Sequence, residues 1–299
     1  MNQRRIPTIS RTFCGLLLAT LSLAGCAVLE GGDAGDGLRL PPIVDRPSDE
    51  RHPGKFVWHD LLTPDTLAAR SFYGDLLGWS FKETGAYVEI YNGDHKIGGM
   101  LAIRPRQENR VEAQWLASMS VPDVEEAVRQ VESGGGRIIN GPMDLGPRGR
   151  AALIEDPAGA HLLLLQSAAG DPPDREPRLG DWLWNEVWTL DPDATAAFYQ
   201  PLGRYQEVLE GEDYRILVNE GHWRAGIRRI DQAGYAGRWV PVIRVADPDA
   251  LLEKVEQLGG TVWVRPGEVQ NGTRTALISD NTGALIMLQQ WDFQGEGDQ

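Results

Sequence analysis

WHDLLTPD, at residues 58–65, returns as WNEVWTLD at residues 184–191 of this 299-residue chain. FY at 72–73 returns at the same offset, as FY at 198–199. Further pairs continue in the same order, 124 residues apart: Asp123 with Asp247, Arg150 with Arg274, Asp156 with Asp280, and Gln166 with Gln290. Ordered self-similarity of this kind indicates a duplicated domain. We expect halves at residues 55–168 and 182–293, a polar Pro-rich linker at 169–181, and a tail at 294–299.

Each half alternates short apolar runs with two helical patterns. An apolar stripe with helical spacing runs through residues 65–77, and Gly78 follows it as the expected stop. A second helix is expected to begin at Asp123, which a Glu follows three residues later in a capping-box pattern. DP at 247–248 begins the matching helix of the second half. The pattern of one strand, one helix and several strands therefore occurs about four times.

This arrangement resembles the vicinal oxygen chelate superfamily, which includes glyoxalase I, extradiol dioxygenases and bleomycin-resistance proteins. The resemblance rests on TPD at 63–65, FYGDLLGW at 72–79, VPD at 121–123 and DPAGAH at 156–161, which the second half repeats more loosely. It covers nearly all of residues 55–292. It implies an α+β fold in which four βαβββ modules form two cup-shaped open barrels, one in each half.

The superfamily commonly holds a divalent metal, with ligands on the first strand of a module and on the last strand. The resemblance places those positions at Trp58, Leu116, Leu163, Trp184, Val240 and Met287. None of these side chains offers the oxygen or imidazole that such a cation requires. A register shift of one would bring in His59 or His161, but the two-residue period of a strand turns His59 away from the face of Trp58. We therefore expect neither metal nor cofactor.

The matched first strands provide the candidate ligand-binding residues. Trp58 and Trp184 occupy equivalent places, and Asp60 and Glu186, two residues on, face the same way. A carboxylate beside an indole can hold a cation or act as a base with a raised pKa. Two arginines at matched positions before a strand complete the candidates as anion ligands at the cup mouths: Arg150 and Arg274. The structural alternative is that the carboxylates pair with Arg150, Arg244 or Arg274 while the indole rings fill the cups.

The first 25 residues have the features of a bacterial export signal. Three arginines and no acidic residue precede an apolar stretch at 13–25, which is shorter than the ~20 residues that span a bilayer. LAGC at 23–26 resembles the lipobox, which implies cleavage before Cys26 and acylation of its thiol by palmitate or a similar chain. We expect a lipoprotein of the cell envelope, held in the bilayer by acylated Cys26 on the periplasmic or outer face. Residues 26–54, rich in Gly, Asp and Pro, are expected to form a flexible tether.

The net charge and the absence of two common catalytic and phosphate-binding motifs exclude several classes of function. The formal net charge is -14, and loss of residues 1–25 removes three arginines, which makes it -17. Nucleic acid is not an expected partner of so acidic a chain. No Gly-x-Ser-x-Gly elbow and no phosphate-binding loop is present. The preferred hypothesis is an envelope protein that binds a small aromatic or cationic molecule. The alternatives are a glyoxalase- or dioxygenase-type enzyme with a non-standard site, and a non-catalytic scaffold with filled cups.

Overall fold

The computed structural model describes residues 38–103, 113–209, 213–268 and 274–293. The expected signal peptide, Cys26 and the tail at 294–299 lie outside these residues. The first half contains β1 (Phe56–Thr63), α1 (Thr66–Leu77), β2 (Ser80–Thr84), β3 (Tyr87–Asn92), β4 (His95–Ala102), β5 (Gln114–Ser120), α2 (Val124–Ser133), β6 (Arg137–Asp144), the 3-10 turn η2 (Gly146–Arg148), β7 (Gly149–Glu155) and β8 (His161–Ser167). The second half contains β9 (Trp182–Thr189), α3 (Pro192–Gly203), β10 (Gln206–Leu209), β11 (Tyr214–Asn219), β12 (His222–Arg229), β13 (Arg238–Val245), α4 (Asp249–Gln257), β14 (Thr261–Val264), β15 (Thr275–Ser279) and β16 (Leu285–Gln290).

Each half is built on one eight-stranded mixed sheet. The strand orders are β2-β3-β4-β1-β5-β8-β7-β6 and β10-β11-β12-β9-β13-β16-β15-β14, which are equivalent element by element. In the first sheet, β1 pairs parallel with β4 and antiparallel with β5, so the first strands of two βαβββ modules lie side by side at the centre. The second sheet repeats this with β9 between β12 and β13. The predicted α+β duplication of four modules is confirmed.

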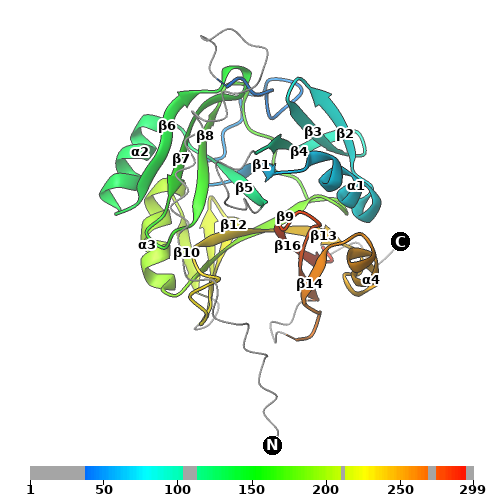
Figure 1. The fold of residues 1–299 in the computed structure, drawn as a ribbon. Coiled ribbons are helices and arrows are strands. Elements are labelled where there is room, and N and C mark those ends of the chain that lie inside the picture. The colour runs from blue at the N-terminus through cyan, green and yellow to red at the C-terminus, as the bar shows by residue number, and fades with distance from the viewer. Residues whose placement is uncertain (1–37, 104–112, 210–212, 269–273, 294–299) are drawn as a thin grey trace, which may run out of the picture.

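The first two helices, α1 and α2, begin and end at the residues that the sequence pattern indicates, whereas α4 begins one residue after the expected Pro248. Asp65 precedes α1, and its side chain accepts a hydrogen bond from the backbone N–H of Ala68 at 2.9 Å. Gly78 ends α1 with a positive φ of 74°, a conformation that glycine adopts without a steric penalty. Asp123 caps α2 in the same way, with the N–H of Glu126 as donor. The helices cover one face of each sheet, and the opposite face curls into a concave surface, cup 1 in the first half and cup 2 in the second (Figure 1).

The two halves share their apolar cores. Phe72 of α1 belongs to the same buried cluster as Leu252 of α4 and Ile278 of β15. The second cluster joins Val124 of α2 to Phe198 of α3. The sheets therefore meet through their helix-bearing sides and curl away from each other, so that the cups face opposite ends of the molecule (Figure 1).

The pseudo-symmetry extends to a polar pair at the centre of the interface. His59 Nε2 lies 2.9 Å from Oδ1 of Asn185, the residue that occupies the equivalent position in β9. The imidazole is buried and stacks on Trp182, with ring centroids 4.1 Å apart. Burial lowers the pKa of His59 to about 4. His59 therefore stands between the halves, on the face opposite to Trp58, as the strand period predicts.

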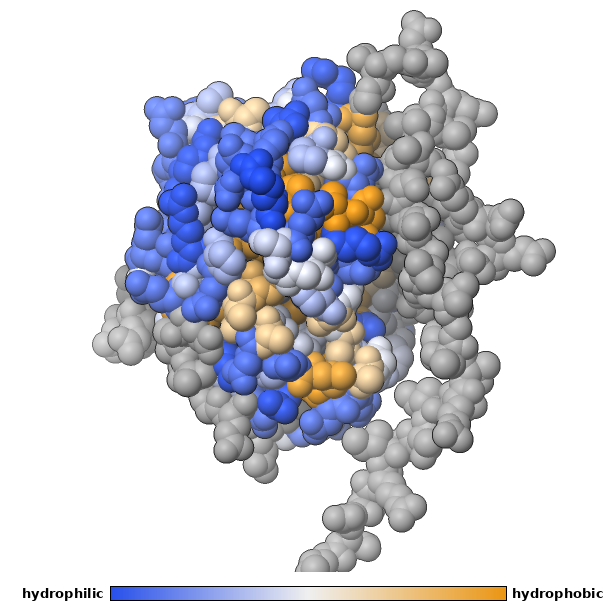
Figure 2. Space-filling model, turned by 90° about the vertical axis from the view of Figure 1, so that its left-hand side faces the viewer, coloured by the Kyte–Doolittle hydropathy of each residue, from blue (hydrophilic) through white to orange (hydrophobic). Residues whose placement is uncertain are grey.

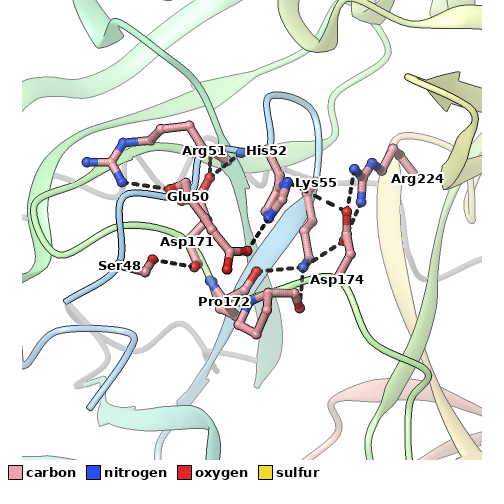
Figure 3. Close-up of polar contacts among 11 residues, drawn as sticks. Ser48, Glu50, Arg51, His52, Lys55, Asp171, Pro172, Asp174 and Arg224 are labelled. Carbon is pink, nitrogen blue, oxygen red and sulfur yellow. Dashed lines mark hydrogen bonds and ion pairs between the residues drawn. The ribbon is translucent and has the colours of Figure 1, made fainter. Parts of the chain in front are cut away.

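An ionic cluster fixes the linker between the halves (Figure 3). The Asp174 carboxylate lies 2.8 Å from Lys55 Nζ of the first half and 2.7 Å from Arg224 Nη1 of the second. Burial alone would raise the pKa of Asp174, but the bonds from Arg224 and Lys55 hold it well below its ordinary range. Asp171 also accepts a hydrogen bond from the backbone N–H of His52 at 2.7 Å. The linker is thus tied both to the start of the first half and to β12.

Most of the outer surface on the side of α2 and α3 is hydrophilic. Figure 2 shows charged and polar residues there, with apolar residues only in small patches that polar side chains separate. In the part of the chain that the structure describes, no helix has the length and apolar character to span a membrane.

Candidate functional site

In cup 1, three buried side chains surround the carboxylate of Asp60. Its Oδ1 accepts hydrogen bonds from Trp58 Nε1 at 3.0 Å and from the hydroxyl of Tyr87. Its Oδ2 lies 3.0 Å from Nη1 of Arg148, whose Nη2 donates to Tyr87 at 2.9 Å. We refer to Trp58, Asp60, Tyr87 and Arg148 as the cup 1 quartet. Because every carboxylate oxygen has a donor and the facing charge is buried with it, Asp60 is not free to act as a base or to bind a cation.

Cup 2 contains an equivalent group of four side chains, but its arginine comes from a different element of the fold than the arginine of cup 1. Arg228 binds Glu186 through two parallel bonds, Nε to Oε2 at 2.7 Å and Nη2 to Oε1 at 2.9 Å. The hydroxyl of Tyr214 donates to Glu186 Oε1 at 3.0 Å and accepts from Trp184 Nε1 at 2.8 Å. We refer to Trp184, Glu186, Tyr214 and Arg228 as the cup 2 quartet. Its guanidinium comes from β12, whereas Arg148 comes from η2 before β7.

The charged groups of each quartet stabilise one another. Burial alone would lower the pKa of Arg148, but the facing Tyr87 and Asp60 raise it above its ordinary value. Burial alone would likewise lower the pKa of Arg228, and the bonds to Glu186 reverse this. Burial, followed by the neighbouring carboxylate, raises the pKa of Tyr87 and of Tyr214 above the ordinary value for a phenol. Both tyrosines therefore stay protonated and act as hydrogen-bond donors.

A glycine in the neighbouring strand makes room for each tyrosine. A Cβ atom at Gly99 would lie 1.7 Å from the hydroxyl of Tyr87, and one at Gly226 would lie 2.1 Å from that of Tyr214. No side chain other than hydrogen fits at such a distance, so the two glycines are what let the phenols cross the strand to the carboxylates. Gly226 follows Gly99 by the same spacing that separates Tyr214 from Tyr87. This matched pair was the signal that would have identified the tyrosines from the sequence.

The six residues predicted from the sequence divide into two groups. The structure places Trp58 and Asp60 together in cup 1, and Trp184 and Glu186 together in cup 2. Arg150 and Arg274 lie elsewhere, at exposed positions. Arg150 forms an ion pair with Glu125 of α2, and Arg274 with Asp247 and Asp249 at the start of α4. Both arginines therefore support helix starts in the structure, and the carboxylates pair with Arg148 and Arg228 instead.

Cup 1 is filled by the chain's own residues 38–46, which we call the plug. Leu40 and Ile43 of the plug are almost fully buried against the cup wall, with exposed fractions of 4% and 2%. The backbone N–H of Leu40 donates to the carbonyl of Leu145 at 2.9 Å. Beneath the plug, the described residues line a cavity of about 30 Å³, enough for one or two water molecules.

The plug corrects the expectation of a flexible tether through residue 54. The composition of residues 27–37 is dominated by Gly and Asp, but four apolar side chains follow closely in LRLPPIV at 38–44. They pack because cup 1 offers an apolar surface, which is a tertiary effect that local composition does not reveal.

The matched walls of cup 2 are less buried than those of cup 1. Trp58, Tyr87 and Leu153 of cup 1 are 2%, 3% and 2% exposed, whereas their equivalents Trp184, Tyr214 and Leu277 are only half-buried. Two further indoles with much larger exposed fractions, Trp223 at 53% and Trp263 at 48%, stand on β12 and β14. The rings of Trp184 and Trp223 meet edge to face with centroids 6.4 Å apart. Cup 2 therefore presents an aromatic wall above a charge-balanced quartet.

The residues at the superfamily's metal positions do not fit a metal. Trp58, Leu116 and Leu163 belong to the apolar cluster of cup 1, and Val240 and Met287 to that of cup 2. The positions thus face the cups as expected, but they supply hydrocarbon and indole. Among the described residues, no group of three or more His, Cys, Asp or Glu side chains could hold a metal ion. Metal chemistry therefore has no donor set in the described cups.

Comparison with known proteins agrees with this architecture. Residues 55–164 match the family model of the Glyoxalase/Bleomycin resistance protein/Dioxygenase superfamily. The first half of the chain therefore matches a glyoxalase-superfamily domain. Among solved structures, homoprotocatechuate 2,3-dioxygenase from Brevibacterium fuscum has a TM-score of 0.58 at 15% identity, over 87% of this chain and 86% of that one. The Mn(II)-bound glyoxalase from Novosphingobium aromaticivorans has a TM-score of 0.53 at 17% identity, over 80% and 82%.

Two curated relatives align with most of this chain and with nearly all of their own length. The putative glyoxylase CFP32 of Mycobacterium tuberculosis is 29% identical over 241 residues, which cover 77% of this chain and 92% of the relative. The anthracycline biosynthesis protein DnrV of Streptomyces peucetius is 27% identical over 264 residues, which cover 79% and 94%. The similarity thus extends over both halves of the chain.

Proposed function

We propose that this protein is a lipid-anchored envelope protein that binds a small aromatic molecule in cup 2 without a metal. The observation that carries the proposal is the difference between the matched cups. The plug covers Trp58 and Tyr87 in cup 1, whereas their equivalents in cup 2 are only half-buried. Cup 2 also carries the exposed indoles of Trp223 and Trp263. Soluble proteins rarely leave clustered indoles in water unless the surface binds something.

The chemistry of cup 2 favours a neutral aromatic ligand over a cation. The charge of Glu186 is already balanced by the two bonds from Arg228, so a cation would gain little from this carboxylate. The half-buried face of Trp184 remains available for stacking. Two relatives bear names that connect them with anthracycline biosynthesis, and anthracyclines are polycyclic aromatic compounds. This agrees with an aromatic ligand, although the names themselves concern the relatives.

A titration with a neutral hydroxyanthraquinone tests the site. We expect quenching of tryptophan fluorescence and a Trp184→Leu variant that binds about 2- to 13-fold more weakly, the range that corresponds to one aromatic pair. Trp58→Leu is the matched control, because it makes the same change at the equivalent position of the plugged cup. A quaternary ammonium compound of similar size should bind more weakly than the anthraquinone. Equal binding by wild type and Trp184→Leu, or no binding by either, would contradict the proposal.

The anchor is a separate part of the proposal and has its own test. It is supported by the basic start, the apolar stretch and LAGC at 23–26. Full-length protein produced in a bacterium should sediment with membranes and carry an acyl mass on Cys26. The Cys26→Ser variant should lose the acyl mass and the normal cleavage. Wild-type protein recovered without an acyl group from the cytosol would contradict the anchor.

An enzyme of the glyoxalase type is the second candidate, and the relation to CFP32 over 92% of its length is the observation that favours it. If the purified protein turns over a thiohemiacetal or a catechol and the Glu186→Gln variant does not, the enzyme would replace the binding protein as the preferred function.

A further inference from the structure

The contacts of the buried Arg148 guanidinium show what cup 1 is built to hold. Its Nη1 and Nη2 are taken by Asp60 and Tyr87 of the cup 1 quartet. Its Nε donates to the backbone carbonyl of Pro41 at 2.8 Å. The side chain is fully buried and lies over the ring of Trp58, with the guanidinium carbon 5.0 Å from the ring centroid. One edge of the guanidinium is thus satisfied only by the plug.

The plug contacts cup 1 in the manner of a bound peptide. It belongs to neither sheet and is held by polar contacts along its length and by two buried apolar side chains, Leu40 and Ile43. Lys96 Nζ lies 3.3 Å from the carbonyl of Pro42 and 3.2 Å from Oδ1 of Asp45. Beneath it, the cavity of about 30 Å³ shows that the plug does not completely fill the space. The plug therefore offers cup 1 two apolar side chains and one carbonyl oxygen for Arg148, and it adds a carbonyl and a carboxylate to Lys96, which Glu89 also binds at 2.7 Å.

We propose that cup 1 is a second ligand site, specific for neutral apolar molecules that carry a carbonyl group, with the plug as its exchangeable internal occupant. The class follows from Arg148, because Lys96 keeps its ion pair with Glu89 when the plug leaves. If the plug leaves, Nε of Arg148 becomes a buried donor without an acceptor, so a replacement must bring an acceptor oxygen. A negative charge is not required, since Asp60 already balances the guanidinium. The remaining wall, formed by side chains such as Leu62, Leu116 and Leu163, accepts hydrocarbon. The inference concerns cup 1 and does not depend on the function proposed for cup 2.

Prodan, a neutral naphthyl ketone whose emission shifts to the blue in apolar surroundings, is a suitable probe. In the full-length protein, Ile43→Asp places a charge at a buried position of the plug and should displace the plug from the cup. This variant should gain one blue-shifted prodan site per chain, bound at least tenfold more tightly than by wild type. Pro47→Asp makes a comparable change at an exposed position beyond the plug and should behave as wild type.

Two additions test the chemistry and the location. The prodan analogue with a methylene in place of the carbonyl should bind the Ile43→Asp variant at least tenfold more weakly, and a capped peptide of residues 38–46 should displace prodan. The new site should persist when Trp184→Leu is added, which separates it from any prodan bound in cup 2. A folded Ile43→Asp protein with no new site, equal binding of the two analogues, or no competition by the peptide would each overturn the proposal.

If the Ile43→Asp variant does not fold, hydrogen exchange of the wild-type protein tests whether the plug can leave cup 1. An exchangeable plug requires the amide of Leu40 to exchange faster than the amides of β8, because the plug can open while the sheet stays folded. Exchange of Leu40 only at the rate of the central strands would make the plug part of the core and would overturn the proposal.

Discussion

The hydroxyl of Tyr199 in α3 donates to Oδ2 of Asp156 in the other half of the molecule, at 3.0 Å. The reciprocal bond joins Tyr73 in α1 to Asp280, also at 3.0 Å. Asp156 is the first residue of the DPAG turn and also accepts from the backbone N–H of Ala160 at 2.7 Å. The most recognisable motif of each half thus anchors the opposite half. Its aspartate holds the domains together and does not face either cup.

Removing either hydroxyl should weaken the interface. Tyr73→Phe and Tyr199→Phe each leave a buried carboxylate without one donor and an indole without its acceptor, since Trp115 and Trp239 donate to these hydroxyls at 2.9 Å. We expect each variant to lower the free energy of unfolding by about 1–3 kcal/mol, measured by urea denaturation. Tyr91→Phe, at a less buried hydroxyl, should change it far less. If both interface variants unfold with the wild-type midpoint, the reciprocal bonds contribute nothing.

Stability should depend on pH through His59. Its pKa is about 4 in the folded protein, against 6.5 for an unperturbed histidine. Between these values the unfolded chain binds a proton that the folded chain does not. The free energy of unfolding should therefore be unaffected by His59 above pH 6.5 and fall as the pH drops toward 4, by about 2–3 kcal/mol. Urea denaturation at pH 7 and pH 4.5 measures the difference.

The matched control for this titration is a histidine on the surface. His59→Gln should flatten the decline above pH 4, whereas His161→Gln, at a partly exposed position beside Glu155, should leave it in place. An unchanged pH dependence in His59→Gln would assign the effect to other groups.

Gly226 should be intolerant of any side chain. A methyl group there would lie 2.1 Å from the hydroxyl of Tyr214 and would force the phenol away from Glu186. Gly226→Ala should lower the free energy of unfolding by about 1–3 kcal/mol, the usual range for an overpacked site, and should weaken aromatic binding in cup 2. Gly234→Ala, where a Cβ atom would meet nothing within 4 Å, is the control. Equal stability of the two variants would show that Tyr214 has another position available.

Purified protein should contain far less than one equivalent of manganese, iron, zinc or nickel per domain. The physical reason is that Trp58, Leu163, Trp184 and Met287 offer a metal no donor at the superfamily's ligand positions. Elemental analysis measures the content, and a chelator should leave the thermal midpoint unchanged. A content of about one metal per domain that is lost in the Glu186→Gln variant would favour an enzyme over a metal-free binding protein.

Most of the fold could be predicted from the sequence, but only the tryptophan and the carboxylate of each quartet could. The repeated spacing placed the halves, and the two-residue period of β1 placed Trp58 and Asp60 on the cup face. Arg148 and Arg228 were not predicted, because they stand at non-equivalent positions and no repeat marks them. Arg148 also follows register shifts in β6, so its direction depends on irregular pairing that no periodic pattern encodes. The plug was missed because its burial depends on a surface more than 100 residues away in the chain, at Leu145 and Leu153.

The position of the plug also determines how far the folded protein can lie from a membrane. With the plug seated, at most the residues from Cys26 to Leu38 separate the proposed anchor from the folded protein, a reach of about 40 Å when fully extended. Release of the plug through residue 46 would lengthen that reach to about 70 Å. Binding of a small apolar carbonyl compound in place of the plug would then increase the distance from the membrane that the folded protein can reach. This distance determines which neighbours in the envelope cup 2 is able to meet.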